Sequence, residues 1–135
     1  MKPIRTVFDT NVYLAAIKKG SYASVQLQRA RPNGPYQLFI SPEIIIEIRR
    51  KLESKFDYST KDSAAFVEMI MRYATLVHSK QKIRGVLKDV DDHIILECAL
   101  EANASMIVTT DRGLLRLKEF HGISIVHPTM LQYLT

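Results

Sequence analysis

The sequence is poor in cysteine and has no long apolar run, and each shortage narrows the class of protein. The one cysteine, Cys98, cannot form an intramolecular disulfide, which fits a reducing compartment. No apolar run approaches the roughly 18 residues that a transmembrane helix needs, so no membrane partner is expected. A strand-like run begins within a few residues of Met1 and leaves no room for a signal peptide, so we expect a cytoplasmic protein.

The chain also lacks internal repeats, low-complexity runs and interdomain linkers. Its 135 residues fit one domain over residues 1–135, and 47% of them are hydrophobic, which is enough for a substantial core. Lysine and arginine number 19 against 14 acidic residues, for a net charge of +5. That excess permits an anionic partner such as nucleic acid without requiring one.

Five short β-prone runs alternate with helical patterns along the chain. This alternation predicts a three-layer α/β/α fold with a central, mostly parallel five-stranded sheet and helices on both faces. We expect the strand order 3-2-1-4-5, in which the first and fourth strands are neighbours and their carboxyl ends border a ligand crevice. The predicted strands are residues 4–8, 36–40, 76–78, 106–109 and 123–126.

A cluster of carboxylates directly precedes an apolar helix that leads into the fourth predicted strand. Cys98 lies on the apolar face of this helix and is expected to be a buried, unreactive thiol, whereas His93 is expected to face solvent. The carboxylates of the cluster are Asp89, Asp91 and Asp92. The apolar face consists of Ile94, Ile95, Cys98, Ala99 and Ala102.

Further acids lie where the predicted strands end. Asp9 ends the first strand and Asp111 follows the fourth, so residues about a hundred positions apart should meet at a crevice that Asp92 also borders. Each acid alone has a structural interpretation, because Asp9 and Asp111 can cap helices and Glu47 can pair with Lys51 one turn later. Together, however, like charges this close raise one another's pKa unless a cation lies between them. Mg²⁺, which prefers oxygen ligands, would remove that cost.

These residues resemble the motifs of the PIN-domain ribonucleases, in particular the VapC-like toxins of toxin–antitoxin pairs. The resemblance extends over essentially the whole chain and rests on the ordered set of motifs, because no single motif is specific. The motifs are Asp9-Thr10-Asn11, Ser41-Pro42-Glu43 with Glu47, Asp89-Val90-Asp91-Asp92, and Thr109-Thr110-Asp111. Among the departures, Thr110 replaces a frequent glycine and would narrow the approach to Asp111. Asn103 also replaces a glycine, but asparagine tolerates the left-handed backbone that follows a helix.

The resemblance implies an endoribonuclease that depends on Mg²⁺ or Mn²⁺ and cleaves single-stranded or structured RNA with a metal-activated water. One or two ions would be bound, and in a two-ion site the ions lie about 3.5–4 Å apart. The implied catalytic residues, which are also the implied metal ligands, are Asp9, Glu47, Asp92 and Asp111.

Residues beside the acids would orient the substrate. Asn11 and Thr109 are implied to orient a metal ligand or the scissile phosphate, and Arg112 is the first candidate for a contact with the RNA backbone. Further cations could draw the substrate in, although an exposed helix face explains each of them equally well. They are Arg49, Arg50, Lys51, Lys82, Arg84 and Arg116.

The expected partners are RNA, an antitoxin protein and a second copy of the chain. A helix expected from residue 59 or 60 to about residue 74 is apolar around much of its circumference, which favours a homodimer interface over complete burial. Three other functions stay open: a housekeeping RNA-processing nuclease, a receiver-like phosphoacceptor, and a metal-free RNA-binding or interaction module. The receiver-like alternative is the weakest, because it needs an acid pair after the first strand, and Asp9 is alone there.

Overall fold

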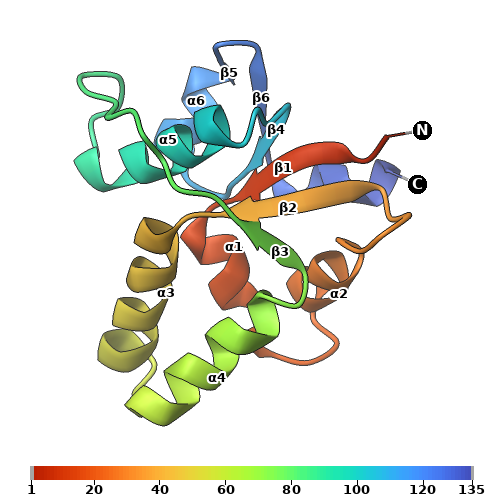
Figure 1. Cartoon of the computed structure of the whole chain (residues 1–135), viewed down its shortest axis with the longest axis vertical. Coiled ribbons are helices and arrows are strands. Elements are labelled where there is room, and N and C mark those ends of the chain that lie inside the picture. The colour runs from red at the N-terminus through yellow and green to blue at the C-terminus, as the bar shows by residue number, and fades with distance from the viewer. Residues whose placement is uncertain (1, 135) are drawn as a thin grey trace.

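A six-stranded sheet forms the centre of the computed structural model, which describes residues 2–134 (Figure 1). The strand order is β3-β2-β1-β4-β6-β5. All neighbouring strands are parallel except β5 and β6, which are antiparallel. The strands are β1 (Ile4–Phe8), β2 (Tyr36–Ile40), β3 (Ala74–Leu76), β4 (Met106–Val108), β5 (Glu119–Phe120) and β6 (Ile123–Val126). The predicted α/β class with a mostly parallel sheet is therefore confirmed.

The sheet differs from the predicted one at its two edges. The predicted fifth strand is β6, and a two-residue strand, β5, precedes it and extends the sheet. His121 and Gly122 join β5 to β6 with φ angles of 51° and 79°, the left-handed backbone that tight hairpin turns need. A two-residue strand is too short to show an alternating pattern, so it was not predicted. At the other edge, β3 begins at Ala74 rather than Leu76, because Ala74 pairs with Leu38.

Helices follow most strands, and several begin at serine side chains that cap the helix N-terminus. Ser21, Ser41 and Ser59 each accept a backbone N–H in the first turn of a helix, as N-cap residues do. The α-helices are α1 (Thr10–Leu14), α2 (Tyr22–Gln28), α3 (Pro42–Lys55), α4 (Thr60–Ile70), α5 (His93–Glu101) and α6 (Arg112–Leu117). Short 3₁₀ turns occupy Ala15–Ile17, Val90–Asp92 and Pro128–Tyr133.

Helix α5 packs against β1, β2 and β4 and carries the centre of the core. Its buried residues extend further round the helix than predicted: His93 and Glu97 are buried, whereas Ile94 is only half-buried. The reason is that α5 is covered on two sides, by the sheet on one and by the segment that leads up to it on the other. Asn103 follows α5 with a φ of 50°, the left-handed conformation expected there.

Helices α3 and α4 form a hairpin that projects from the sheet (Figure 1). Only Ser63 and Ile70 of α4 are buried; Phe66, Val67 and Met69 pack partly against the core. Helix α4 is therefore neither fully enclosed nor fully exposed, and the homodimer stays a prediction. No helix within residues 2–134 has both the length and the apolarity needed to cross a membrane.

Candidate active site at the carboxyl ends of the strands

The hydrogen-bond ladder of the sheet continues past the ends of β1, β4 and β6 and brings two predicted site residues together. The Asp9 N–H donates to the carbonyl of Val108 at 2.9 Å, and the Thr109 N–H donates to the carbonyl of Val126 at 3.0 Å. Asp9 and Thr109 therefore lie side by side, and the Thr109 hydroxyl donates to Asp9 Oδ2 at 2.7 Å. The backbone register of three parallel strands fixes this contact.

Asp9 is buried, and each of its two carboxylate oxygens accepts one hydrogen bond. Its Oδ1 accepts the N–H of Thr10 at 2.7 Å, which makes Asp9 the N-cap of α1 as well as a partner of Thr109. Burial raises the pKa of Asp9 above its usual range, while hydrogen bonds from Thr109 and Thr10 and the charge of Lys51 lower it. The structural and the functional interpretations of Asp9 are thus compatible, because the cap leaves lone pairs on both oxygens.

Asp111 is tied to the same threonine. Its N–H donates to Thr109 Oγ1 at 2.9 Å, and its Oδ2 accepts the N–H of Leu114 at 2.9 Å, so Asp111 caps α6. The Thr109 hydroxyl thus accepts from the backbone of Asp111 and donates to the carboxylate of Asp9. One side chain sets the spacing of both acids.

Asp92 completes a group of three aspartates. It occupies the N-cap position of α5, but its side chain makes no cap hydrogen bond, whereas Asp89 caps the preceding 3₁₀ turn. Burial, and then the charges of Asp111, Asp9 and Asp89, raise the pKa of Asp92 to about 7. Acids from three separate segments therefore lie close enough to repel one another.

Asp92 and Asp111 line a cavity of about 600 Å³, together with cationic side chains. Arg112 and Arg116 of α6 and Lys88 lie on its wall. This places the predicted Arg112 beside two of the acids. A neighbouring cavity of about 710 Å³ between α3 and α5 is lined by Glu47, among others, with the cations Arg50, Lys82 and Arg84. Arg49 is not part of either cavity; it bonds to Ser63 and pairs with Glu53.

Glu47 forms an ion pair with a lysine that also contacts α1. Its Oε1 lies 3.2 Å from Lys51 Nζ, the ion pair that the sequence suggested, and Lys51 Nζ also donates to Asn11 Oδ1 at 3.3 Å. Asn11 therefore holds Lys51 rather than an acid. Sequence reasoning gave Lys51 as a partner of Glu47 and as a candidate substrate cation, but it did not predict the contact with Asn11.

The donor set suits a hard divalent cation, although it does not enclose one. Within residues 2–134, no three His, Cys, Asp or Glu side chains are arranged to hold a metal ion together. Mg²⁺ usually takes only one or two carboxylates and completes its shell with water and substrate phosphate. The three aspartates offer only oxygen ligands, and the pKa of Asp92 is raised first by burial and then by repulsion from its acidic neighbours, which a cation would relieve. One or two of Asp9, Asp92 and Asp111, with water and substrate phosphate completing the shell, could therefore hold the ion.

The cysteine and the histidine of α5 have structural roles. Cys98 is fully buried, which confirms the expected burial, and burial raises the pKa of its thiol to about 12, as is typical of structural cysteines. The expectation that His93 faces solvent is wrong. His93 is 5% exposed, and its Nε2 accepts the N–H of Leu87 at 3.0 Å, because residues 80–88 lie across the helix.

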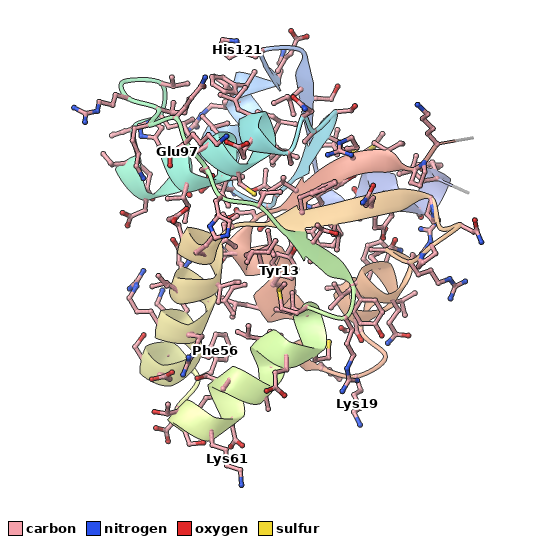
Figure 2. All side chains as sticks on the ribbon, in the orientation of Figure 1. Tyr13, Lys19, Phe56, Lys61, Glu97 and His121 are labelled. Atoms are coloured by element: carbon pink, nitrogen blue, oxygen red, sulfur yellow. The ribbon has the colours of Figure 1, made fainter. Side chains whose placement is uncertain are left out.

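Residues 80–88 form a covering segment that α5 holds at three points. His93, Glu97 and Glu101, spaced four residues apart on one helix face, accept the N–H groups of Leu87 (3.0 Å), Ile83 (2.9 Å) and Lys80 (3.1 Å). Figure 2 shows Glu97 where this segment crosses the helix. Sequence reasoning missed this arrangement; the signal was three polar side chains at helical spacing on an otherwise apolar helix.

The sequence matches the PIN domain family over residues 5–113, a stretch that contains all four predicted acids. The chain belongs to the PIN domain family. The resemblance noted in the sequence is thereby confirmed, and the receiver-like alternative is excluded. PIN domains are generally nucleases, so the chain is a nuclease at the level of the family.

A solved structure shares the fold. The chain is similar to a chain of VapBC2 from Rickettsia felis, whose crystal structure was determined bound to a DNA fragment from their promoter. The TM-score is 0.67 and the sequence identity 16%, and the likeness covers 92% of this PIN domain and 98% of the other chain. A search of curated protein sequences found no significant match.

Proposed function

We propose that this PIN domain is an endoribonuclease that depends on Mg²⁺ or Mn²⁺ and cleaves single-stranded RNA. The observation that carries the proposal is the convergence of Asp9, Asp92 and Asp111 from three segments beside a cavity with cationic walls. In a structural protein one cap for each helix would suffice. Here Asp92 caps nothing and carries the cost of its acidic neighbours.

The three aspartates would have different roles in binding the ion. Asp9 is the fixed ligand, because two hydrogen bonds of 2.7 Å hold its carboxylate. Asp92 is the adjustable one, since it has no cap bond and must lose the proton that its neighbours stabilise. Asp111 joins them from the N-terminus of α6. A divalent cation bound here would supply Lewis acidity, which activates water and offsets charge on the phosphate.

RNA would enter along the cationic wall of the cavity. Arg112 and Arg116 lie beside Asp92 and Asp111, where they can contact phosphates on either side of the scissile bond. Attack by water rather than by the ribose 2′-hydroxyl leaves a 5′-phosphate on one product. This product would distinguish the proposed chemistry from that of metal-free ribonucleases.

We further propose that the protein is the toxin of a toxin–antitoxin pair and acts in the cytoplasm as a homodimer of one-domain subunits. The likeness to a chain of VapBC2 from Rickettsia felis supports an antitoxin partner. Co-expression with a neighbouring reading frame tests this part. Growth arrest by the chain alone, relieved by its neighbour, is expected; a housekeeping nuclease would not show relief.

Cleavage assays with single-stranded RNA test the chemistry. We expect cleavage with Mg²⁺ or Mn²⁺, none in EDTA, and a loss of at least about a hundredfold in Asp9→Asn and in Asp92→Asn. Lys61→Ala is the matched control, because Lys61 lies at the tip of the α3–α4 hairpin, far from α5 (Figure 2). Cleavage that survives EDTA or Asp92→Asn would contradict the proposal. RNA that is bound but never cut would indicate a binding module.

A further inference from the structure

Lys51 holds Glu47 and Asn11 at the edge of the aspartate group. Its Nζ lies 3.2 Å from Glu47 Oε1 and 3.3 Å from Asn11 Oδ1, and the side chains of Lys51 and Glu47 are only 17% and 16% exposed. This is a sheltered contact rather than a loose surface ion pair. It also connects α3 to α1, the helix that Asp9 caps.

Lys51 also lies close to the segment that carries Asp9. Its partner Asn11 follows Asp9 by two residues in the first turn of α1, so the ammonium lies beside both Glu47 and the start of the helix that Asp9 caps. Lys51 therefore lies beside Glu47 and the start of α1, where a second ion shared by Glu47 and the aspartates would have to bind. The ammonium already neutralises Glu47, and a divalent cation beside it would meet strong like-charge repulsion in a sheltered place.

We propose that Lys51 takes the place of a second divalent cation, so that this PIN domain binds a single ion at its aspartates and Glu47 is not a metal ligand. The inference rests on the proposed function, because it presupposes the aspartate site. It assigns Glu47 a different role, which is to anchor the ammonium. It also makes Lys51 a fixed positive charge of the site, present whether or not an ion is bound.

Counting bound Mn²⁺ in the protein without RNA tests this proposal independently of activity. Calorimetry and electron paramagnetic resonance should give one Mn²⁺ for each wild-type chain. Lys51→Met keeps the length of the side chain but removes its charge, so Glu47 and Asn11 are freed and a second Mn²⁺ should bind. The double variant Lys51→Met with Glu47→Gln should return to one, because the freed carboxylate is gone.

Two control variants separate charge from position. Lys51→Arg retains a cation at the same place and should bind one Mn²⁺. Lys55→Met removes an exposed charge one turn further along α3 and should also bind one. Circular dichroism and thermal melting of every variant establish that the fold is intact before the ions are counted.

The outcomes distinguish this inference from the function on which it rests. Two Mn²⁺ in the wild type would overturn the role of Lys51 and leave the nuclease proposal standing. One Mn²⁺ in both the wild type and Lys51→Met would also overturn it, since removing the ammonium would then open no site. No Mn²⁺ in the wild type would overturn the aspartate site itself, and the inference with it.

Discussion

The hydroxyl of Thr109 donates to Asp9 Oδ2 at 2.7 Å, across a separation of 100 positions in the sequence. The hydroxyl oxygen of Thr109 also accepts the N–H of Asp111 at 2.9 Å. Thr109 is fully buried, so water cannot replace either bond without a rearrangement. The orientation of two acids therefore depends on one small side chain that is not itself acidic.

Replacing this threonine should loosen the site without removing any acid. Thr109→Val retains the shape but leaves Asp9 Oδ2 without its donor, so we expect Mn²⁺ affinity to fall about 10- to 100-fold. Thr109→Ser keeps the hydroxyl and should remain within a few-fold of the wild type. Calorimetric titration with Mn²⁺ measures both variants. Equal affinities in Thr109→Val and the wild type would show that Asp9 needs no support.

Asp92 should make the metal-free protein less stable as the pH rises. Its pKa is about 7 in the folded state and about 3.9 in an unfolded chain, so the folded state binds the proton more tightly. The stabilisation of the folded state by this proton is complete below pH 4 and is lost between pH 4 and pH 7. Because Asp92 is partly exposed, solvent screening reduces the effect to on the order of 1 kcal/mol.

Asp92→Asn removes the titrating group and provides the comparison. In EDTA at pH 8 the variant should melt about 3–5 °C above the wild type, and the two should converge at pH 4. Scanning calorimetry across this range measures the difference. A variant that is less stable than the wild type at pH 8 would mean that Asp92 makes a favourable contact in the metal-free state.

Arg112 should contribute to RNA binding through charge alone. Each phosphate contact with single-stranded nucleic acid adds about 0.7 to the slope of log affinity against log salt concentration. Arg112→Ala should lower that slope by about this amount, and Lys61→Ala should leave it unchanged. Fluorescence anisotropy with a labelled single-stranded RNA in EDTA, where no cleavage occurs, gives the slopes. Equal slopes for Arg112→Ala and the wild type would place the RNA elsewhere.

Glu97 should keep the covering segment, residues 80–88, ordered. Its Oε2 accepts the Ile83 N–H at 2.9 Å, and losing a buried charged acceptor costs about 1–3 kcal/mol. In Glu97→Ala the amides of this segment should exchange hydrogen about tenfold faster for each 1.4 kcal/mol lost. Hydrogen exchange measured by mass spectrometry resolves the segment.

Lys82→Ala separates this hydrogen bond from the ion pair that accompanies it. Lys82 Nζ lies 3.8 Å from Glu97 Oε1, and the lysine is 63% exposed, so the pair contributes little. The exchange of residues 80–88 should stay close to that of the wild type in this variant. Faster exchange in Lys82→Ala than in Glu97→Ala would assign the order of the segment to the ion pair instead.

The sequence predicted those parts of the fold that local patterns determine. β-prone runs and serine caps at Ser41 and Ser59 identified the parallel strands and the long helices. The position of Asp9 at a strand end also implied that it would meet Asp111. A strand as short as β5 carries no such pattern, because its pairing depends on a hairpin turn rather than on its own residues.

The site was less predictable wherever side chains cross between elements. The spacing of Glu47 and Lys51 on one helix suggested their ion pair, whereas the bond from Lys51 Nζ to Asn11 Oδ1 at 3.3 Å joins two helices and was not predicted. His93 looked exposed because helical periodicity describes one element at a time and cannot show what lies across it. A segment without regular structure, residues 80–88, buries that histidine. Contacts of this kind depend on the route of a loop, which local composition does not specify.

The covering segment and the aspartates are held by different contacts. The selectivity of the enzyme can therefore change independently of its reaction centre. Strand register positions Asp9 and Thr109, whereas side chains of α5 accept the hydrogen bonds that hold residues 80–88. If the protein cleaves RNA as proposed, a change of length or charge in that segment would alter which RNA reaches the cavities and leave the aspartates in place. Substrate selectivity could thus differ among related proteins, or be engineered by exchanging this segment, with little effect on the catalytic rate.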